Sequence, residues 1–141
     1  MTAEKLHGMS GTLKMATGTV PAASAAGTVT GSAIDRLGYD HCVLEAGLGA
    51  STGTPTSFTV DSKITHCETS GGTYTDLTGG AVTQLTAVNT RKKKSVSLKG
   101  AYRYLKVVTV AAFSGGSSPT IANAVTVILG GADTMPAQSD D

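Results

Sequence analysis

The fold is decided by residues 101–113, whose sequence is AYRYLKVVTVAAF. Both parities of this stretch carry apolar side chains. One parity holds Leu105, Val107 and Phe113, and the other holds Tyr102, Tyr104, Val108 and Val110. β-branched and aromatic residues favour strands, and alternate residues of a strand point to opposite faces. The stretch therefore predicts a central strand that is covered on both sides.

Shorter apolar runs surround this strand on both sides in the sequence. They predict strands over residues 28–34, 41–48, 57–67, 82–88, 95–99 and 122–129, with a short one near Tyr74. The 18 glycines punctuate these runs, and no apolar period of a helix persists along the chain. The pattern predicts an all-β chain, a jelly-roll-like β-sandwich of about eight antiparallel strands. An immunoglobulin-like sandwich is the alternative, although the chain has no Trp for its core.

The composition divides the chain into three parts. Residues 1–27 are rich in Ala, Gly, Ser and Thr, and are predicted to form a flexible or extended N-terminal arm with one short strand near residues 12–16. Residues 28–131 are predicted to form the β-sandwich, and residues 132–141 a polar C-terminal tail. We find neither an apolar signal peptide nor a run long enough to span a bilayer. We therefore expect synthesis in a cytoplasm and no membrane partner.

Charge and motif content argue against several classes of function. The 11 basic and 10 acidic residues give a net charge of +1, which disfavours a nucleic-acid groove. The chain lacks a nucleophile elbow, a P-loop and a metalloprotease helix motif, and its carboxylates are not spaced as acid–base pairs. We therefore expect no catalytic residues, no cofactor and no enzymatic activity. A carbohydrate-binding sandwich stays open as an alternative, although aromatics make up only 4%.

Two His-Cys dipeptides, His41-Cys42 and His66-Cys67, suggest a zinc site at first sight. Adjacent residues of a strand point to opposite faces, however. The parity predicts Cys42 and His66 on the core face, and His41 and Cys67 on the outer face. At most two ligands converge where a structural zinc needs four, so no metal site is predicted. The same parity argues against a disulfide and predicts one buried and one exposed thiol.

Six residues are candidates for binding a partner. Arg91, Lys92, Lys93 and Lys94 form a basic run that is predicted to be an exposed hairpin turn. The run could bind an acidic protein surface, or it could only keep a strand edge soluble. Nucleic acid is a weaker candidate, because no aromatic residues for base stacking lie between the basic ones. Tyr102 and Tyr104 lie on the second parity of the central strand. That face could be covered by the arm, or it could meet another subunit.

Several motifs of this sequence are similar to those of one known protein family. Residues 99–108, KGAYRYLKVV, are similar to a motif that precedes a Gly/Ser loop and a last Ala/Val strand ending in glycine, here residues 114–119 and 122–130. Upstream, the similar parts are GYD at residues 38–40, the apolar run 43–47, the run 57–64 and SGGTYTD at residues 70–76. The resemblance covers about residues 28–131, and the arm and the basic run depart from it.

The family that the chain resembles is that of the capsid cement, or head decoration, proteins, which are small virion proteins of tailed bacteriophages. The resemblance implies a structural virion protein with a jelly-roll-like domain, which decorates the outer capsid surface and clamps adjacent major capsid subunits. Its implied partners are the major capsid protein and further copies of this chain, as a dimer or trimer on a symmetry axis. The resemblance brings no catalytic residues with it. Another virion component, such as a head–tail joining or tail protein, is the alternative.

Overall fold

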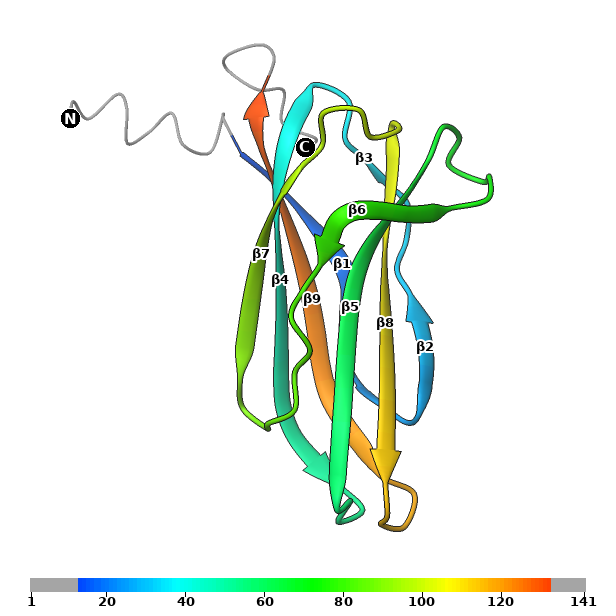
Figure 1. Ribbon diagram of the computed structural model, residues 1–141, viewed down its shortest axis with the longest axis vertical. Coiled ribbons are helices and arrows are strands. Elements are labelled where there is room, and N and C mark those ends of the chain that lie inside the picture. The colour runs from blue at the N-terminus through cyan, green and yellow to red at the C-terminus, as the bar shows by residue number, and fades with distance from the viewer. Residues whose placement is uncertain (1–12, 133–141) are drawn as a thin grey trace, which may run out of the picture.

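The computed structural model describes residues 13–132, which form nine β-strands in two antiparallel sheets (Figure 1). The first sheet contains, in spatial order, β1 (Lys14–Ser24), β9 (Thr120–Ala132), β4 (Tyr39–Thr52) and β7 (Arg91–Ser97). The second sheet contains β2 (Gly27–Thr30), β8 (Tyr104–Ser114), β5 (Ser57–Cys67) and β6 (Thr75–Ala81), and β3 (Ile34–Asp35) also pairs with β8. The prediction of an all-β sandwich is confirmed. This part of the chain has no helix long and apolar enough to cross a membrane.

The two halves of the chain pair in nested antiparallel order. β1 pairs with β9, β2 with β8, β4 with β7, and β5 with β6. This arrangement is one long ribbon of paired strands, and curling the ribbon brings β4 beside β9 and β5 beside β8. The result is a jelly roll, as predicted. The order of the strands differs from that of the two sheets of an immunoglobulin domain.

The core lies between the sheets and is built from alternate residues of the long strands. On β9 the buried side chains are those of Ile121, Asn123, Val125, Val127 and Leu129. Cys42, Leu44, Ala46 and Leu48 of β4 lie beside them, and Leu105, Val107 and Ala111 of β8 and Val60 and Ile64 of β5 face them from the second sheet. Removing the Val, Leu and Ile side chains of this core from water stabilises the fold by about 1.5–3 kcal/mol each. The apolar residues that recur at every second position in the sequence are therefore the residues that the structure buries.

The boundary of the sandwich differs from the one predicted at residue 28. Lys14–Ser24 forms β1, which pairs with β9 along the edge of the first sheet. Strand β1 has no apolar alternation that would predict it, because its residues are small and mostly exposed and only Gly18 and Thr19 are buried. Backbone hydrogen bonds to β9 hold it in place instead of apolar burial. Residues 1–12 and 133–141, which belong to the predicted arm and tail, lie outside the described residues.

The region between β5 and β7 also differs from its prediction. The expected strand over residues 82–88 is a loop, in which the buried Leu85 makes two backbone hydrogen bonds with Val60, at 2.9 and 3.0 Å. The strand here is β6, which begins directly after Tyr74, where only a short strand was predicted, and extends to Ala81. A Cβ atom at Gly80 would lie 3.4 Å from Ile64 Cβ, so this glycine lets β6 approach β5 closely.

Candidate partner-binding surface

Only one face of β8 is covered by described residues, although the strand lies in the interior of its sheet. Leu105 and Val107 on the inner face are buried. On the outer face Val108 is half-buried and Val110 is 37% exposed. Residues 13–132 therefore do not supply the predicted cover of this face, and cover by another subunit stays a prediction. β1 does not cover the outer face because it pairs with β9 in the opposite sheet.

Three of the chain's four tyrosines gather at one end of the second sheet, where β8 begins. The ring of Tyr102 stacks on that of His66 with the centroids 4.8 Å apart. The Arg103 guanidinium lies 5.2 Å from the Tyr104 ring centroid, and Lys106 Nζ lies 4.5 Å from that of Tyr74. These are cation–π distances. We call this group the tyrosine surface, and its members are His66, Tyr74, Tyr102, Arg103, Tyr104 and Lys106.

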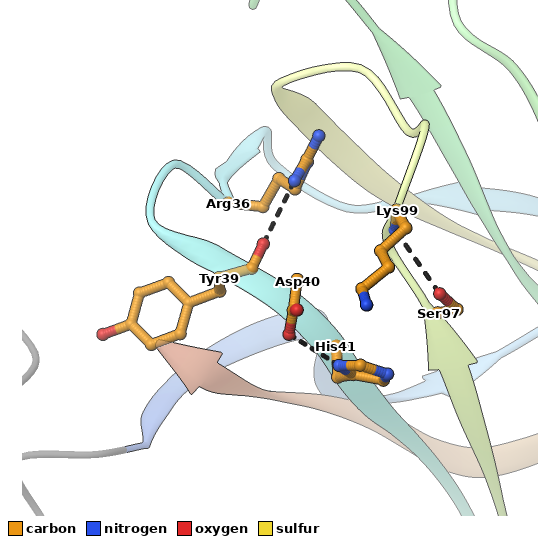
Figure 2. Close-up of polar contacts among 6 residues, drawn as sticks. All are labelled: Arg36, Tyr39, Asp40, His41, Ser97 and Lys99. Carbon is orange, nitrogen blue, oxygen red and sulfur yellow. Dashed lines mark hydrogen bonds and ion pairs between the residues drawn. The ribbon is translucent and has the colours of Figure 1, made fainter. Parts of the chain in front are cut away.

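Arg36 fixes the segment that carries Tyr102. Its guanidinium donates hydrogen bonds to the carbonyls of Tyr39, at 3.1 Å, and Tyr102, at 3.0 Å, and also to that of Ala101. Figure 2 shows the bond to Tyr39 at the start of β4. The backbone N–H of Tyr102 donates to His66 Nδ1 at 3.1 Å. One side chain thus joins the β3–β4 turn to the segment before β8, which gives Tyr102 a defined position.

Asp35 fixes Arg103 through a paired hydrogen bond. Arg103 Nε and Nη2 donate to the two carboxylate oxygens of Asp35, at 3.0 and 2.7 Å. These bonds lower the pKa of Asp35, against the opposing effect of its partial burial, and the Leu37 backbone N–H adds to the lowering. The same pair raises the pKa of Arg103. The planar guanidinium is therefore held in place beside the Tyr104 ring, in an arrangement that Lys could not reproduce.

A second polar pair lies at the same end, on the first sheet. Asp40 Oδ1 is 2.6 Å from His41 Nδ1, and this contact is the main cause that lowers the pKa of Asp40 (Figure 2). Gly131 of β9 lies against the pair, and a Cβ atom there would clash with Asp40 Oδ1. Its φ of 65° also favours glycine. The pair therefore sits where β9 crosses the start of β4.

The predicted basic turn is a strand. Arg91, Lys92, Lys93 and Lys94 begin β7, the edge strand that pairs with β4 in the first sheet, and all four are exposed. A turn was predicted here because four consecutive cations lack the apolar alternation that indicates a strand. β4 supplies the buried residues of this pair of strands, and β7 contributes Val96.

The two His-Cys dipeptides lie in different sheets, and one of their thiols is not where it was predicted. Cys42 faces the core, and burial raises its pKa to about 11. Cys67 lies opposite Tyr104 on the outer face of β5, yet it is buried as well. The loop after β5 covers it, because a Cβ atom on Gly72 would lie 2.5 Å from Cys67 Sγ. Among residues 13–132 no group of three or more potential metal ligands converges.

The six candidate residues therefore fall into two separate places. Tyr102 and Tyr104 belong to the tyrosine surface on the second sheet, and the basic run lies at an edge of the first. The sequence did not single out His66, Tyr74, Arg103 and Lys106 as parts of a surface. Lys106 could have been found from its parity with Tyr104. Tyr74 could not, since a loop brings it over the sheet.

Comparisons with known proteins bear on the fold. No family model and no curated protein matches this sequence. A chain in the structure of infectious bursal disease virus, Gx strain, is similar with a TM-score of 0.52 and 12% identity, over 89% of this chain and 34% of that one. The present chain thus spans about a third of the length of the viral chain. A chain of the disulfide-linked pili of Bacillus endospore appendages aligns with a TM-score of 0.40 and 16% identity, over 84% of this chain and 88% of that one.

Proposed function

We propose that this chain is a structural protein of a virion, which decorates the outer surface of a phage capsid and clamps adjacent major capsid subunits. The observation that carries the proposal is the tyrosine surface, a rigid group of aromatic and basic side chains displayed on a jelly roll. Tyrosine and arginine are enriched at the centres of protein interfaces. The resemblance of residues 28–131 to cement proteins and the fold that the chain shares with a viral chain favour a virion as the assembly.

The tyrosine surface suits a contact that must be repeated many times on a shell. Asp35 holds the Arg103 side chain, and the Tyr102 ring stacks on His66, before any partner binds. Less side-chain entropy therefore remains to be lost on binding. Each contact can then be modest, because copies that bridge neighbouring subunits act together. The proposal involves no catalytic step and no cofactor.

A second copy of the chain is the further partner that we propose. The outer face of β8 offers the half-buried Val108 and Val110, which is 37% exposed. Apolar side chains on a sheet face that residues 13–132 leave open are a surface that a dimer or trimer on a symmetry axis would cover. This contact would place the tyrosine surface of each copy at the rim of the oligomer.

Stoichiometry in purified particles tests the proposed role. The amount of this chain relative to the major shell protein would be measured by quantitative mass spectrometry with isotope-labelled peptides. We expect one copy per shell subunit, or a simple fraction of it. A dozen copies or fewer per particle would overturn decoration in favour of a head–tail joining or tail component. Absence from particles would overturn a virion role altogether.

Variants of the tyrosine surface test where the shell is bound. Tyr102→Ala and Arg103→Ala should each weaken binding of the chain to undecorated shells by about 30-fold or more, the effect of an interface hot spot. Met15→Ala is the matched control, because Met15 is 72% exposed on β1 in the other sheet. Equal binding by all three variants would show that the shell contact lies elsewhere. Circular dichroism and thermal unfolding would establish that each variant is folded.

A further inference from the structure

The four edge strands of the sandwich differ in how well they could accept another strand. β1 has two register shifts against β9 and contains Pro21, and β6 has one shift against β5. β2 is four residues long. β7 pairs with β4 over seven consecutive residues, from Arg91 to Ser97, without a shift. Bulges, proline and short length block edge pairing, so β7 is the edge with the geometry to accept a strand.

The backbone of β7 presents free groups on its open side. The Leu48 N–H donates to the Thr90 carbonyl at 2.7 Å, and the Leu98 N–H to the Asp40 carbonyl at 2.8 Å. Backbone groups in an antiparallel pair alternate between facing the partner strand and facing away. The even-numbered residues of β7 therefore bond to β4, while Arg91, Lys93 and Ser95 turn their N–H and C=O groups outward. Among residues 13–132, no strand lies beyond β7 on this side of the sheet (Figure 1).

The side chains of β7 give this edge its charge. Arg91 forms an ion pair with Glu45 at 3.2 Å, and Lys92 Nζ donates to the Gln84 carbonyl at 2.9 Å. Within residues 13–132, the side chains of Lys93 and Lys94 make no hydrogen bond or ion pair. A shallow depression of about 310 Å³ lies beside the edge, lined by Glu45 and residues 91–93. The edge thus combines unpaired main-chain groups with unneutralised positive charge.

We propose that β7 binds an extended acidic segment of a protein partner, which adds to the first sheet as a further strand. The cations prevent β7 of one copy from pairing with β7 of another, because like charges would lie side by side. The same cations favour a strand that carries carboxylates, so they both prevent self-association of this edge and select an acidic partner. Main-chain hydrogen bonds supply the affinity, and the charges supply the specificity.

The alternation of the cations defines the segment that fits. Arg91 and Lys93 lie on the outer face of the sheet, whereas Lys92 and Lys94 share the parity of the buried Ala46 and Leu44. A matching strand therefore carries acidic residues on both of its faces, that is, at adjacent positions, over about 23 Å. This inference goes beyond the proposed function, whose contacts lie in the other sheet, and it does not require the partner to be a shell protein.

Amide hydrogen exchange on the full chain tests the inference with a peptide probe of sequence TDEVDET. The neutral peptide TNQVNQT, with Asn and Gln in place of the acids, is the control. At a saturating concentration of the acidic peptide, the outward amides of Lys93 and Ser95 should exchange at about one tenth of their free rate or more slowly. The amides of Lys92 and Lys94 should change little, because they already bond to β4. The neutral peptide should give no protection at the same concentration.

Two substitutions separate the charge from the main-chain contact. Lys93→Glu/Lys94→Glu should weaken peptide binding by about tenfold or more at low salt, since two attractive pairs become repulsive. Ser95→Pro removes one outward N–H and leaves the bonds to β4 intact, so it should also weaken binding, whereas Ser95→Ala should not. Thermal unfolding would confirm that each variant retains the fold.

A different protection pattern would overturn the inference. If exchange slowed equally at all amides of β7, with no alternation between outward and inward amides, the peptide would be binding only as a polyanion. Equal binding of a single-stranded oligonucleotide would mean the same. Protection on β1 or β2 would place the acceptor edge elsewhere. None of these results would alter the stoichiometry in particles, so the inference and the proposed function can fail separately.

Discussion

The two ends of the sandwich are closed in opposite ways. At the upper end of Figure 1, charged side chains hold the turns: Arg36 binds three carbonyls and Asp35 binds Arg103. At the lower end, residues 53–56 and 115–119 form two turns that bind each other through the backbone. The Ser117 N–H donates to the Gly53 carbonyl at 2.8 Å. We call these the charged end and the glycine end.

The difference shows which end a partner can recognise. The glycine end contains only Gly, Ser, Thr and Pro in its two turns, and five of its residues have positive φ. The glycine end is held by its backbone conformation, and the side chains that it presents to solvent are mainly small hydroxyl groups. At the charged end the side chains of Arg36 and Asp35 fix the turns, and Tyr102 and Arg103 present a ring and a cation to solvent. Tyr and Arg anchor interfaces far more often than Ser and Thr do.

A glycine-to-alanine series should break the glycine end first. At Gly53 the φ is 75° and a Cβ atom would lie 2.4 Å from the Ser117 carbonyl oxygen. Gly53→Ala should therefore lower the free energy of unfolding by about 2–4 kcal/mol, through backbone strain and overpacking together. Urea denaturation would measure this loss.

Two matched glycines provide the controls for that series. Gly100, at the charged end, has a φ of 81° but nothing within 4 Å of an added Cβ atom, so Gly100→Ala should cost about 1 kcal/mol from strain alone. Gly71 has open space and no positive φ, so Gly71→Ala should change stability by less than about 0.5 kcal/mol. A cost at Gly53 no larger than at Gly100 would show that the two turns are not packed as tightly as the structure has them.

Removing the side chain of Arg36 should break the charged end. Arg36→Ala leaves the carbonyls of Tyr39, Ala101 and Tyr102 without this donor, and should cost about 2 kcal/mol of stability. Arg36→Lys should recover only part of the loss, since an ammonium group cannot reach three carbonyls in one plane. The amide of Tyr102 should exchange faster in Arg36→Ala, while that of Ser117 at the glycine end should not. Faster exchange at both ends would mean global unfolding.

Much of the fold could be predicted from the sequence, because the buried strands show a two-residue period. The strand over residues 57–67 was predicted with its observed bounds, and residues 101–113 closely match β8. Edge strands lack that signal. β1 and the start of β7 are held mainly by backbone bonds to β9 and β4, so their side chains are free to be small or charged. Only a short strand near Tyr74 was predicted where β6 lies, because its two glycines indicated a loop, whereas Gly80 is buried against β5.

The candidate surface was predictable only where strand parity applies. Tyr104 and Lys106 follow from the alternation of β8, and Tyr102 from its place before the strand. Tyr74 and the burial of Cys67 depend on how a loop folds over the sheet, which periodicity does not encode. Arg36 could not be assigned its role, because its three acceptors are backbone carbonyls, two of them more than 60 positions away.

Acid titration of the Asp35–Arg103 pair should sharpen the comparison with a smaller effect. Both side chains are partly exposed, 36% and 47%, so Asp35→Asn should cost less than about 1 kcal/mol at neutral pH. The pKa of Asp35 lies below the ordinary 3.8 because the folded state favours its charged form. Its contribution is therefore complete above that pH and is lost as the pH falls through the folded pKa. The difference between wild type and Asp35→Asn, measured by urea unfolding, should shrink below pH 3.8; a constant difference would contradict the pairing.

The smallest effect is expected at the glycine end, where Thr52 and Thr120 share a hydroxyl hydrogen bond of 2.7 Å across β4 and β9. A double-mutant cycle with Thr52→Val and Thr120→Val should give a coupling energy of about 0.5 kcal/mol, typical of cross-strand threonine pairs. The parallel cycle with Asp35→Asn and Arg103→Gln should give a coupling that falls as salt rises, because it is ionic. The threonine coupling should not respond to salt, since neither partner is charged. Equal salt dependence in the two cycles would remove the distinction between the ends, whereas a difference would show that one end is held by charge and the other by neutral contacts.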